Sequence, residues 1–361
     1  MKELDKIAHI ISRDKFTSGY INFMKLKFPM YDHYFLVRDA GFPLDLVDEK
    51  NVIFYHPLHA RFYRPAYAHW EDGRKILSLL DDMKLIVISG FWIQGDVLRW
   101  PQRLWDKTYI QFWGGDFYGF RGAHFWSRGR IKTKLCLRRC KAYIYLVDGE
   151  YEKMMKIFAV PKQYFIAPVP ADPQKKIDLS KYFTRTSDGI VRIIVGNSAT
   201  KENQHKEAYN VLARFRDEAI EVYSPLSYGD EQYRDKVIQY GRLLFGDKYH
   251  PIVDFMQFEG YMDFLSHMDA GIFNNNRQQA LGNIYLLLGM GKRVYVRQDV
   301  SMWKSLHSDG YRLSSFDSLH TIPFDKLDVI SNEDRENNFA VFRAWDSKGI
   351  LQWKKVFDSV K

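Results

Sequence analysis

Residues 191–198 of this chain read VRIIVGNS. An apolar run that ends in a glycine and two small polar residues is typical of a buried strand followed by a tight turn. The next stretch, ENQHKEAYNVLARF, places Ala208, Leu212 and Phe215 on one helical face. A strand followed by an amphipathic helix is the repeating unit of parallel α/β sheets. This stretch therefore predicts an α/β fold, and the flanking sequence repeats the pattern.

Strand and helix patterns alternate on both sides of residues 191–198. Towards the C-terminus, the strand patterns AIEVYSP, PIVDFMQF, AGIFNNN and RVYVR are separated by helical segments. Towards the N-terminus, short β-rich runs are separated in the same way. We expect these N-terminal strands at residues 7–12, 33–38, 52–56, 84–89, 109–113, 142–147 and 164–167. Two such series in one chain predict two α/β domains with parallel sheets.

The two series are separated by PVPADPQKK, a proline-rich stretch followed by a polar segment without periodicity. Such a stretch is typical of a linker. We therefore expect an N-terminal domain over residues 1–170, a linker over 171–189 and a second domain over 190–335. Residues 336–361 have a helical pattern that is interrupted at SKG, residues 347–349. We expect a bent terminal helix there that crosses back to the N-terminal domain.

The composition fits this two-domain interpretation. The chain has 361 residues, of which 46% are hydrophobic and 16% aromatic, and that is enough to bury two cores. No apolar run reaches the roughly 18 residues that a membrane span needs. The N-terminal stretch MKELDKIAHIISRDK has charges on both sides of a short apolar run, unlike a signal peptide. We therefore expect a soluble, cytoplasmic protein.

The two cysteines, Cys136 and Cys140, occur together in CLRRC. A zinc site would need two more ligands nearby, and an iron–sulfur motif would need a third cysteine. Neither is visible in the sequence, so we expect ordinary reduced thiols.

Basic residues are concentrated in one segment. The formal charge of the chain is +9, and residues 121–141 contain eight Lys or Arg and no acid, including Arg128, Arg130, Arg138 and Arg139. Such a patch attracts phosphates on a nucleic acid, on a membrane surface or on a phosphorylated substrate. The alternative is a solvated helix face without a partner.

Two segments of the second domain follow predicted strands and could hold a ligand, because ligands of open α/β sheets bind at the carboxyl ends of strands. Gly196, Asn197 and Ser198 form a turn in which the glycine lets the backbone approach a ligand closely. The segment YSPLSYG offers the hydroxyl of Ser227 and the aromatic face of Tyr228. Each segment could also be an ordinary turn.

A third segment, residues 273–283, runs from a polar strand end into the start of a helix. Arg277 beside a helix N-terminus suits a pyrophosphate, because both attract negative charge. The candidate residues here are Asn276, Arg277, Gln279, Leu281, Gly282 and Asn283. The run of asparagines could instead be a solvated loop.

One carboxylate stands out in the N-terminal domain. Residues 112–118 read FWGGDFY, so Asp116 lies on a glycine-rich turn at the end of a predicted strand. This place gives an acid the reach of a general base or of a group that orients a substrate hydroxyl. Capping of a helix is the structural alternative. Asp14 and Glu259 are further candidates for a catalytic carboxylate.

Three stretches carry a resemblance to a known family: FWGGDFY, VGNSATKENQH and DAGIFNNNRQQALGNIYLLLGMGKRVYV. With them the chain resembles the bacterial 4-acetamido-4,6-dideoxygalactose (Fuc4NAc) transferases, which act in the assembly of enterobacterial common antigen. The resemblance implies a GT-B fold, in which two Rossmann-like domains face each other across a cleft. It also implies that Gly196, Asn197, Ser198 and residues 277–283 contact a nucleotide-sugar donor. Of the N-terminal motif of the family, the chain keeps only Asp14.

We therefore predict a glycosyltransferase that moves a deoxyamino sugar from a nucleoside diphosphate to a glycan or lipid-pyrophosphate-linked acceptor. Asn203 and His205 would hold donor phosphate or sugar. The chain contains no Asp-x-Asp pair, which metal-dependent sugar transferases commonly use, so we expect neither metal nor cofactor.

The resemblance implies that the protein works peripherally on the inner face of the bacterial plasma membrane. We expect its basic segment to bind anionic lipid or the acceptor, and we expect no nucleic-acid partner. Two alternatives are a non-catalytic polyanion- or RNA-binding protein and a GT-B-like sugar-nucleotide epimerase.

Overall fold

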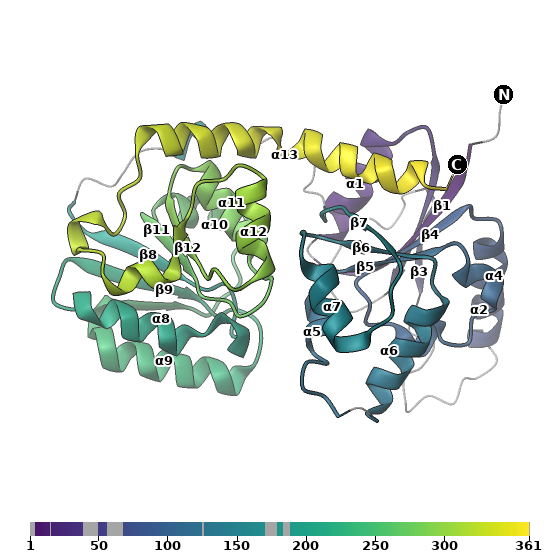
Figure 1. Ribbon diagram of the computed structural model, residues 1–361, viewed down its shortest axis with the longest axis horizontal. Helices are drawn as coiled ribbons and strands as arrows, with labels where there is room; N and C mark the ends of the chain where they lie inside the picture. Colours follow the sequence, from purple (N-terminus) through teal and green to yellow (C-terminus); the bar gives the residue numbers. More distant parts are fainter. Residues whose placement is uncertain are drawn as a thin grey trace. The chain divides into compact units, whose positions relative to one another are not determined.

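The computed structural model describes residues 4–14, 16–38, 50–55, 68–124, 126–169, 179–182 and 188–360. The chain forms two compact units (Figure 1). Unit 1 consists of Met1–Lys176 and Asp346–Lys361, and unit 2 of Ile177–Trp345. Most of the expected linker lies outside the described residues, and so does His56 at the end of the third expected strand.

Unit 1 is built on a parallel sheet of seven strands in the order β3-β2-β1-β4-β5-β6-β7. The strands are β1 (Lys6–Ser12), β2 (Asp32–Arg38), β3 (Val52–Tyr55), β4 (Leu85–Ser89), β5 (Thr108–Phe112), β6 (Ala142–Tyr145) and β7 (Gln163–Ile166). Each of them overlaps a strand expected from the sequence.

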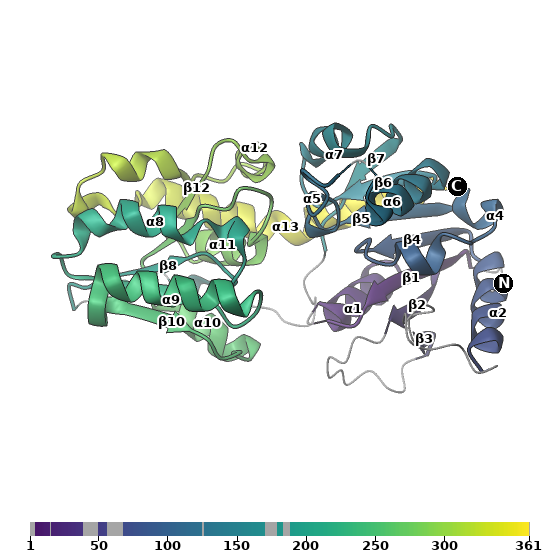
Figure 2. The ribbon, with the colours of Figure 1, turned by 90° about the horizontal axis from the view of Figure 1, so that it is seen from below.

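Helices cover both faces of this sheet (Figure 2). The helices of unit 1 are α1 (Thr17–Lys27), α2 (Ala68–Asp81), α3 (Gln94–Val97), α4 (Gln102–Trp105), α5 (Gly115–Tyr118), α6 (Arg128–Arg139) and α7 (Glu150–Phe158). Residues of α4 to α7 pack on one face. On the other face, α1 packs together with the end of α13 (Asn332–Asp358), which contributes Trp353, Val356 and Phe357.

Unit 2 is built on a parallel sheet of six strands in the order β10-β9-β8-β11-β12-β13. The strands are β8 (Val191–Val195), β9 (Ile220–Pro225), β10 (Tyr249–Ile252), β11 (Ala270–Phe273), β12 (Arg293–Val296) and β13 (Ser314–Ser315). In both units the first strand lies centrally and the fourth pairs with it on the other side, which is the Rossmann order. The predicted α/β fold with two Rossmann-like domains is confirmed.

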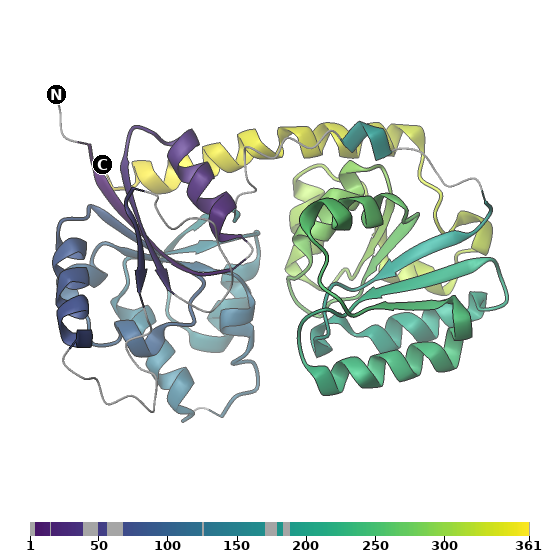
Figure 3. The same ribbon diagram turned by 180° about the vertical axis from the view of Figure 1, so that it is seen from behind.

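The helices of unit 2 also lie on two faces: Figures 1 and 3 show α8 and α9 on one side and α10 to α12 on the other. The α-helices are α8 (His205–Leu212), α9 (Glu231–Phe245), α10 (Phe258–Ser266), α11 (Leu281–Gly289) and α12 (Ser301–Ser308). Single 3-10 turns occur at Leu179–Tyr182, Lys201–Asn203, Ala213–Phe215, Gly246–Lys248, Phe316–His320 and Phe324–Lys326. The expected Ala208–Leu212–Phe215 stripe is buried as predicted.

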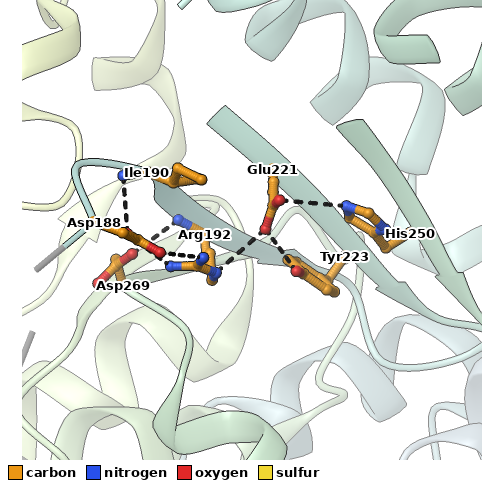
Figure 4. Close-up of polar contacts among 7 residues, drawn as sticks. All are labelled: Asp188, Ile190, Arg192, Glu221, Tyr223, His250 and Asp269. Carbon is orange, nitrogen blue, oxygen red and sulfur yellow. Dashed lines mark hydrogen bonds and ion pairs between the residues drawn. The ribbon is translucent and has the colours of Figure 1, made fainter. Parts of the chain in front are cut away.

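A polar network fixes the amino-terminal ends of the strands of unit 2 (Figure 4). The guanidinium of Arg192 in β8 donates to Asp188 at 2.6 Å and lies 3.2 Å from the carboxylate of Glu221 in β9. The carboxylate of Asp269 accepts the backbone N–H of Arg192 at 2.8 Å. These bonds hold residue 188, where the described chain of unit 2 resumes, against its sheet, and leave the carboxyl ends of the strands free for other contacts.

Helix α13 differs from the sequence prediction. Its pattern is interrupted at residues 347–349, but the helix is continuous from Asn332 to Asp358. A glycine inside a helix costs about 1 kcal/mol, and the burial of Trp353, Val356 and Phe357 in unit 1 outweighs that cost. The beginning of the same helix packs in the core of unit 2 through residues such as Phe342.

Candidate functional site

The strand order of unit 2 marks one place for a ligand. From the central strand β8, the chain proceeds to β9 on one side and later to β11 on the other, so the loops after β8 and β11 diverge at their carboxyl ends. Ligands of Rossmann-like sheets bind at such a switch point. Gly196 follows β8 and Asn274 follows β11, so the fold brings together two of the predicted segments.

The loop after β8 depends on a glycine. Gly196 has a φ of +72°, and a Cβ there would lie 2.6 Å from Nε2 of His205 and 2.8 Å from Oδ1 of Asn203. Oδ1 of Asn203 accepts the backbone N–H of Asn197 at 2.9 Å, and its Nδ2 donates to the Ser198 hydroxyl at 3.1 Å. Any other residue at position 196 would push this loop away from the imidazole.

Side-chain amides join the loops after β8 and β11. Nδ2 of Asn275 donates to Oδ1 of Asn203 at 3.1 Å, and Nε2 of Gln279 donates to the Ser198 hydroxyl at 3.0 Å. Asn203 and Ser198 are fully buried. Both were predicted to contact a donor. Their observed hydrogen bonds join the two loops to each other, and their contact with a donor stays a prediction.

Five buried polar atoms at this edge have no hydrogen-bond partner among the described residues. They are Oδ1 of Asn197, Nε2 of His205, Oδ1 of Asn274, Oδ1 of Asn275 and Oε1 of Gln279. Leaving a buried polar group unpaired costs about 1–3 kcal/mol, and native structures contain few such groups. Their concentration at one switch point indicates a site that a polar ligand completes.

The His205 imidazole is neutral near pH 7, because burial lowers its pKa to about 3. Its Nδ1 lies 3.2 Å from the hydroxyl of Tyr233. When Tyr233 donates to Nδ1, the ring proton is on Nε2, and that N–H faces the Gly196 backbone. His205 then offers a hydrogen-bond donor without a charge.

Arg277 supplies a charge at the same edge. Its side chain is half-buried and donates to the carbonyl of Gln278 at 3.0 Å, and it forms no ion pair with any described residue. It lies just before α11, whose first N–H groups receive no side-chain cap. A half-buried cation next to a helix N-terminus attracts an anion, because both present positive charge.

The remaining predicted residues of the α11 segment differ in what they can offer. Gly282 is exposed with open space around it, and the side chain of Asn283 bonds to Tyr261. The side chain of Leu281 packs against the core, so only its backbone N–H faces a ligand site. Asn276 is exposed and bonded through its backbone N–H to the carbonyl of Glu202.

Tyr228 borders the site on the side of β9. Its hydroxyl accepts from Nδ2 of Asn197 at 2.9 Å, and its ring is 48% exposed. Burial of the hydroxyl raises the pKa of Tyr228, and the nearby Arg277 cation opposes that rise. Ser227 lies half-buried in the same loop. Tyr228, Asn197 and Arg277 therefore lie close together.

Sequence reasoning missed residues that complete this edge. Glu207 accepts from Nδ2 of Asn274 at 2.9 Å and from Arg297 at 3.2 Å, and Arg297 is held by Asp299 at 2.9 Å. Arg297 directly follows β12, so the carboxyl-end rule that selected Gly196 could have selected it. Tyr233, the half-buried partner of His205, has no such signal, because it lies within helix α9 and not after a strand.

The predicted acids lie in three separate places: Asp116 in the short helix α5, Asp14 just before α1, and Glu259 in α10. Asp116 is 3% exposed, and its Oδ2 accepts the backbone N–H of Phe91 at 2.9 Å and of Trp113 at 3.1 Å. Burial raises its pKa to about 6. Oδ1 of Asp14 accepts the N–H of Phe16 at 2.8 Å where α1 begins. Glu259 is exposed in the first turn of α10, in unit 2.

Two of the four predicted basic contacts are engaged inside unit 1. Arg130 donates to the carbonyls of Ala123 and Ile157, at 3.1 and 2.6 Å. Arg139 donates to the carbonyls of Leu98 and Trp100, at 2.8 and 2.6 Å. These guanidinium groups hold α6 in place, because they satisfy carbonyls that have no helical partner. Arg128 and Arg138 are exposed.

Both cysteines are buried free thiols, and burial raises the pKa of each to about 12. No group of three or more potential metal-binding His, Cys, Asp or Glu side chains occurs in the part of the chain that the structure describes. In that part, no helix is long and apolar enough to cross a membrane.

Comparisons with known proteins identify a family. The model of a family described as 4-alpha-L-fucosyltransferase, glycosyl transferase group 56, matches residues 102–321, more than half of the chain. Neither this family match nor the similarity to solved structures reported next favours the two alternatives, a polyanion-binding protein and an epimerase.

The chain is also similar to solved glycosyltransferases. A glycosyltransferase from Rickettsia africae superposes with a TM-score of 0.66 at 11% identity, over 99% of this chain and 98% of the other. Sucrose-phosphate synthase from Thermosynechococcus elongatus gives 0.66 at 12% identity, over 99% of both chains. An E. coli trehalose-6-phosphate structure bound with UDP-2-fluoro glucose gives 0.65 at 10% identity, over 98% of both. These likenesses establish the GT-B fold.

Proposed function

Because the chain belongs to the 4-alpha-L-fucosyltransferase family, glycosyl transferase group 56, and is a glycosyltransferase, we propose that it moves a deoxyamino sugar from a nucleoside diphosphate to a lipid-pyrophosphate-linked saccharide. The observation that carries the donor half of this proposal is the cluster of five unpaired buried polar atoms beside Arg277. A nucleotide sugar brings both the hydroxyl donors and the negative charge that this edge lacks.

Different residues of the site bind different parts of the donor. Arg277 and the free N–H groups of α11 bind the diphosphate, because a cation and a helix N-terminus both attract phosphate. The unpaired amide oxygens of Asn197, Asn275 and Gln279 accept hydroxyls of the donor. Nε2 of His205 donates to a phosphate or sugar oxygen. The similar E. coli structure holds UDP-2-fluoro glucose, which supports this class of donor.

We propose that transfer proceeds without a metal ion. The sequence contains no Asp-x-Asp pair, and the leaving diphosphate needs its growing charge neutralised. The Arg277 guanidinium and the α11 dipole act where that charge develops, as fixed positive groups do in transferases.

We also propose that unit 1 docks on an anionic membrane through α6. The exposed face of this region is formed by Trp126, Arg128, Ile131, Lys132, Leu135 and Arg138. Cations and apolar side chains at this helical spacing suit the boundary between lipid headgroups and acyl chains. Each cation near an anionic surface contributes about 1 kcal/mol, so the attachment is reversible.

The donor site is tested by nucleoside-diphosphate binding. Wild-type protein is titrated calorimetrically with UDP and dTDP, and a Gly196→Ala variant is compared with Arg216→Ala, which removes an exposed arginine outside the site. We expect wild type and Arg216→Ala to bind one of the diphosphates equally and Gly196→Ala to bind more than tenfold more weakly, because its Cβ displaces the loop. Equal binding by all three proteins would contradict this site.

The membrane proposal is tested with liposomes. We expect wild type to sediment with vesicles rich in acidic lipid at low salt, to be released by high salt, and to bind neutral vesicles weakly. Arg128→Glu with Arg138→Glu should abolish sedimentation and leave nucleotide binding intact. The same charge change at exposed Arg216 and Lys236 in unit 2 is the control. Wild type that stays free of acidic vesicles at low salt refutes the docking.

A further inference from the structure

The switch point of unit 1 carries three aromatic rings, of which two are exposed and one, Trp113, is half-buried. Phe16 follows β1, Trp92 follows β4 and Trp113 follows β5, and β1 and β4 are the neighbours at which the strand order reverses. Phe16 is 44% and Trp92 is 47% exposed. The ring centroids of Phe16 and Trp113 lie 5.6 Å apart and those of Trp92 and Trp113 lie 6.1 Å apart, each pair nearly perpendicular. We call these three rings the aromatic platform.

Buried contacts fix the orientation of the two indoles. The Trp113 indole N–H donates to the Ser89 hydroxyl at 3.0 Å, and this hydroxyl donates to Gln111 at 2.6 Å. The Trp92 ring covers Gly90, where the backbone has a φ of +80° and a Cβ would lie 2.4 Å from the ring. A buried hydrogen bond thus orients the Trp113 indole, and the exposed Trp92 ring packs over the Gly90 backbone beside it.

Asp116 ties the two tryptophan loops together. Its Oδ2 accepts the N–H of Trp113 and the N–H of Phe91, the residue before Trp92, and its Oδ1 also lies 3.2 Å from the N–H of Trp113. Its carboxylate is therefore turned into the protein and acts on the platform through the backbone. Asp14 binds the N–H of Phe16 in the same manner.

We propose that the aromatic platform stacks against the apolar C–H face of a sugar ring of the acceptor, with Asp116 as the positioning residue. The partially positive C–H groups of a pyranose match the negative face of an indole. Transfer to one hydroxyl requires that the acceptor ring be held in a fixed orientation, which rigid ring planes provide and a flexible acyl chain does not need. The inference rests on the proposed glycosyl transfer.

The test follows the indole N–H signals of ¹⁵N-tryptophan-labelled protein by NMR. The probes are methyl β-glucopyranoside, methyl β-galactopyranoside and, as an apolar competitor, hexanol. We expect the Trp92 and Trp113 signals to shift saturably with at least one glycoside. The Trp345 signal, from a half-buried indole that packs on Tyr285 in unit 2, is the internal control and should not move. Glycosides that leave Trp92 and Trp113 unshifted while hexanol shifts them, or no shift with any probe, would overturn the proposal.

Variants separate stacking from general structure. Trp92→Ala should reduce glycoside affinity at least fivefold, measured on the Trp113 signal, and Trp92→Phe should retain most of it. Leu243→Ala, which removes an exposed apolar side chain of α9 in unit 2, is the control. Asp116→Asn should shift both platform indole signals without ligand and reduce glycoside affinity several-fold; unchanged signals and affinity would remove Asp116 from the inference. Nucleoside-diphosphate binding should stay intact in all four variants. If wild-type protein binds the nucleotide but no glycoside, the aromatic platform alone is refuted. If wild-type protein does not bind the nucleotide, the proposed function is refuted.

Discussion

The two units have the same strand order at their switch points and opposite chemistry in the loops there. In unit 2 the loops present amides, an imidazole and Arg277, with five buried polar atoms left unpaired among the described residues. In unit 1 the loops present aromatic rings, and the carboxylates of Asp14 and Asp116 accept backbone N–H groups. The fold thus brings corresponding loops together in both units, and the loop sequences differ: we propose a charged nucleotide at the loops of unit 2 and the face of a sugar at those of unit 1.

The buried histidines of the two units differ in the same way. In unit 1, His33 Nε2–H donates to the Phe28 carbonyl at 3.0 Å, which directs His9 Nε2–H to His33 Nδ1 and the Tyr20 hydroxyl to His9 Nδ1, each at 2.9 Å. Every nitrogen of this pair has a partner when both rings are neutral. In unit 2, His205 keeps one ring nitrogen unpaired among the described residues. The hydrogen-bonded chain Tyr20–His9–His33–Phe28, which we call the histidine relay, is therefore complete within the core, whereas His205 keeps a nitrogen that fits the proposed ligand.

The largest expected effect is a loss of stability in acid. Burial lowers the pKa of His33 to about 4 and also lowers that of His9, so the unfolded chain binds more protons than the folded one between about pH 6.5 and pH 4. Stability is therefore complete above about pH 6.5 and falls as the pH drops to about 4, by on the order of 3 kcal/mol for His33. Denaturant unfolding from pH 7 to pH 4 measures this loss.

Two variants sharpen the acid test. His33→Gln should be less stable than wild type at pH 7 and should lose less stability on acidification. His320→Gln, at an exposed position in unit 2, should follow wild type at every pH. If His33→Gln and wild type lose stability in parallel on acidification, protonation of His33 is not the cause of the loss.

The next prediction concerns a substitution at the switch point of unit 1. Asp116→Asn should lower kcat/KM for transfer about 10²-fold, because an acceptor displaced by about 1 Å can cost that much, while donor affinity stays nearly normal. Steady-state kinetics at varied acceptor concentration also separate two roles. A positioning residue raises the acceptor KM when it is changed. A general base lowers kcat and removes the acidic limb near pH 6 that the raised pKa of Asp116 would give. Full activity would exclude both roles.

A smaller effect is expected from a substitution at the switch point of unit 2. Arg277→Ala should weaken nucleoside-diphosphate binding by about 1.5–3 kcal/mol, the scale of a charge-assisted hydrogen bond, and the monophosphate should lose less. Calorimetric titrations with both nucleotides measure the difference, and Trp92→Ala should change neither. An equal loss for the two nucleotides would mean that Arg277 does not contact the β-phosphate.

The last prediction is that removal of divalent metal ions leaves the transfer rate unchanged. If the guanidinium and the helix N-terminus neutralise the diphosphate, transfer in excess EDTA should proceed at the rate measured without it. An assay with added Mg²⁺ or Mn²⁺ completes the comparison. Activity that disappears with EDTA and returns with either ion would show that unit 2 holds its donor through a metal.

The sequence predicted the strands well because burial and periodicity are local properties, as VRIIVGNS shows. It also selected the loops after β8 and β11 as candidates, because the carboxyl-end rule needs only the positions of the strands; that these two loops meet follows from the strand order of the structure. It could not show that Asn203 bonds to Ser198 and Asn275, or that Arg130 and Arg139 donate to carbonyls within unit 1, because hydrogen-bond partners depend on tertiary packing. It was wrong about a break in α13, since a local pattern does not record the burial that outweighs a glycine.

Helix α13 has a consequence for the order in which the protein is completed. Unit 1 begins the chain, but Trp353, Val356 and Phe357, near its end, fill the core beside His9 and His33. Domains generally fold as units during synthesis, starting from the N-terminus. Here the ribosome releases all of unit 2 before it supplies the segment that covers the α1 face of unit 1. The first unit to be translated is therefore the last to close its core, and a chain that ends before α13 leaves that face bare.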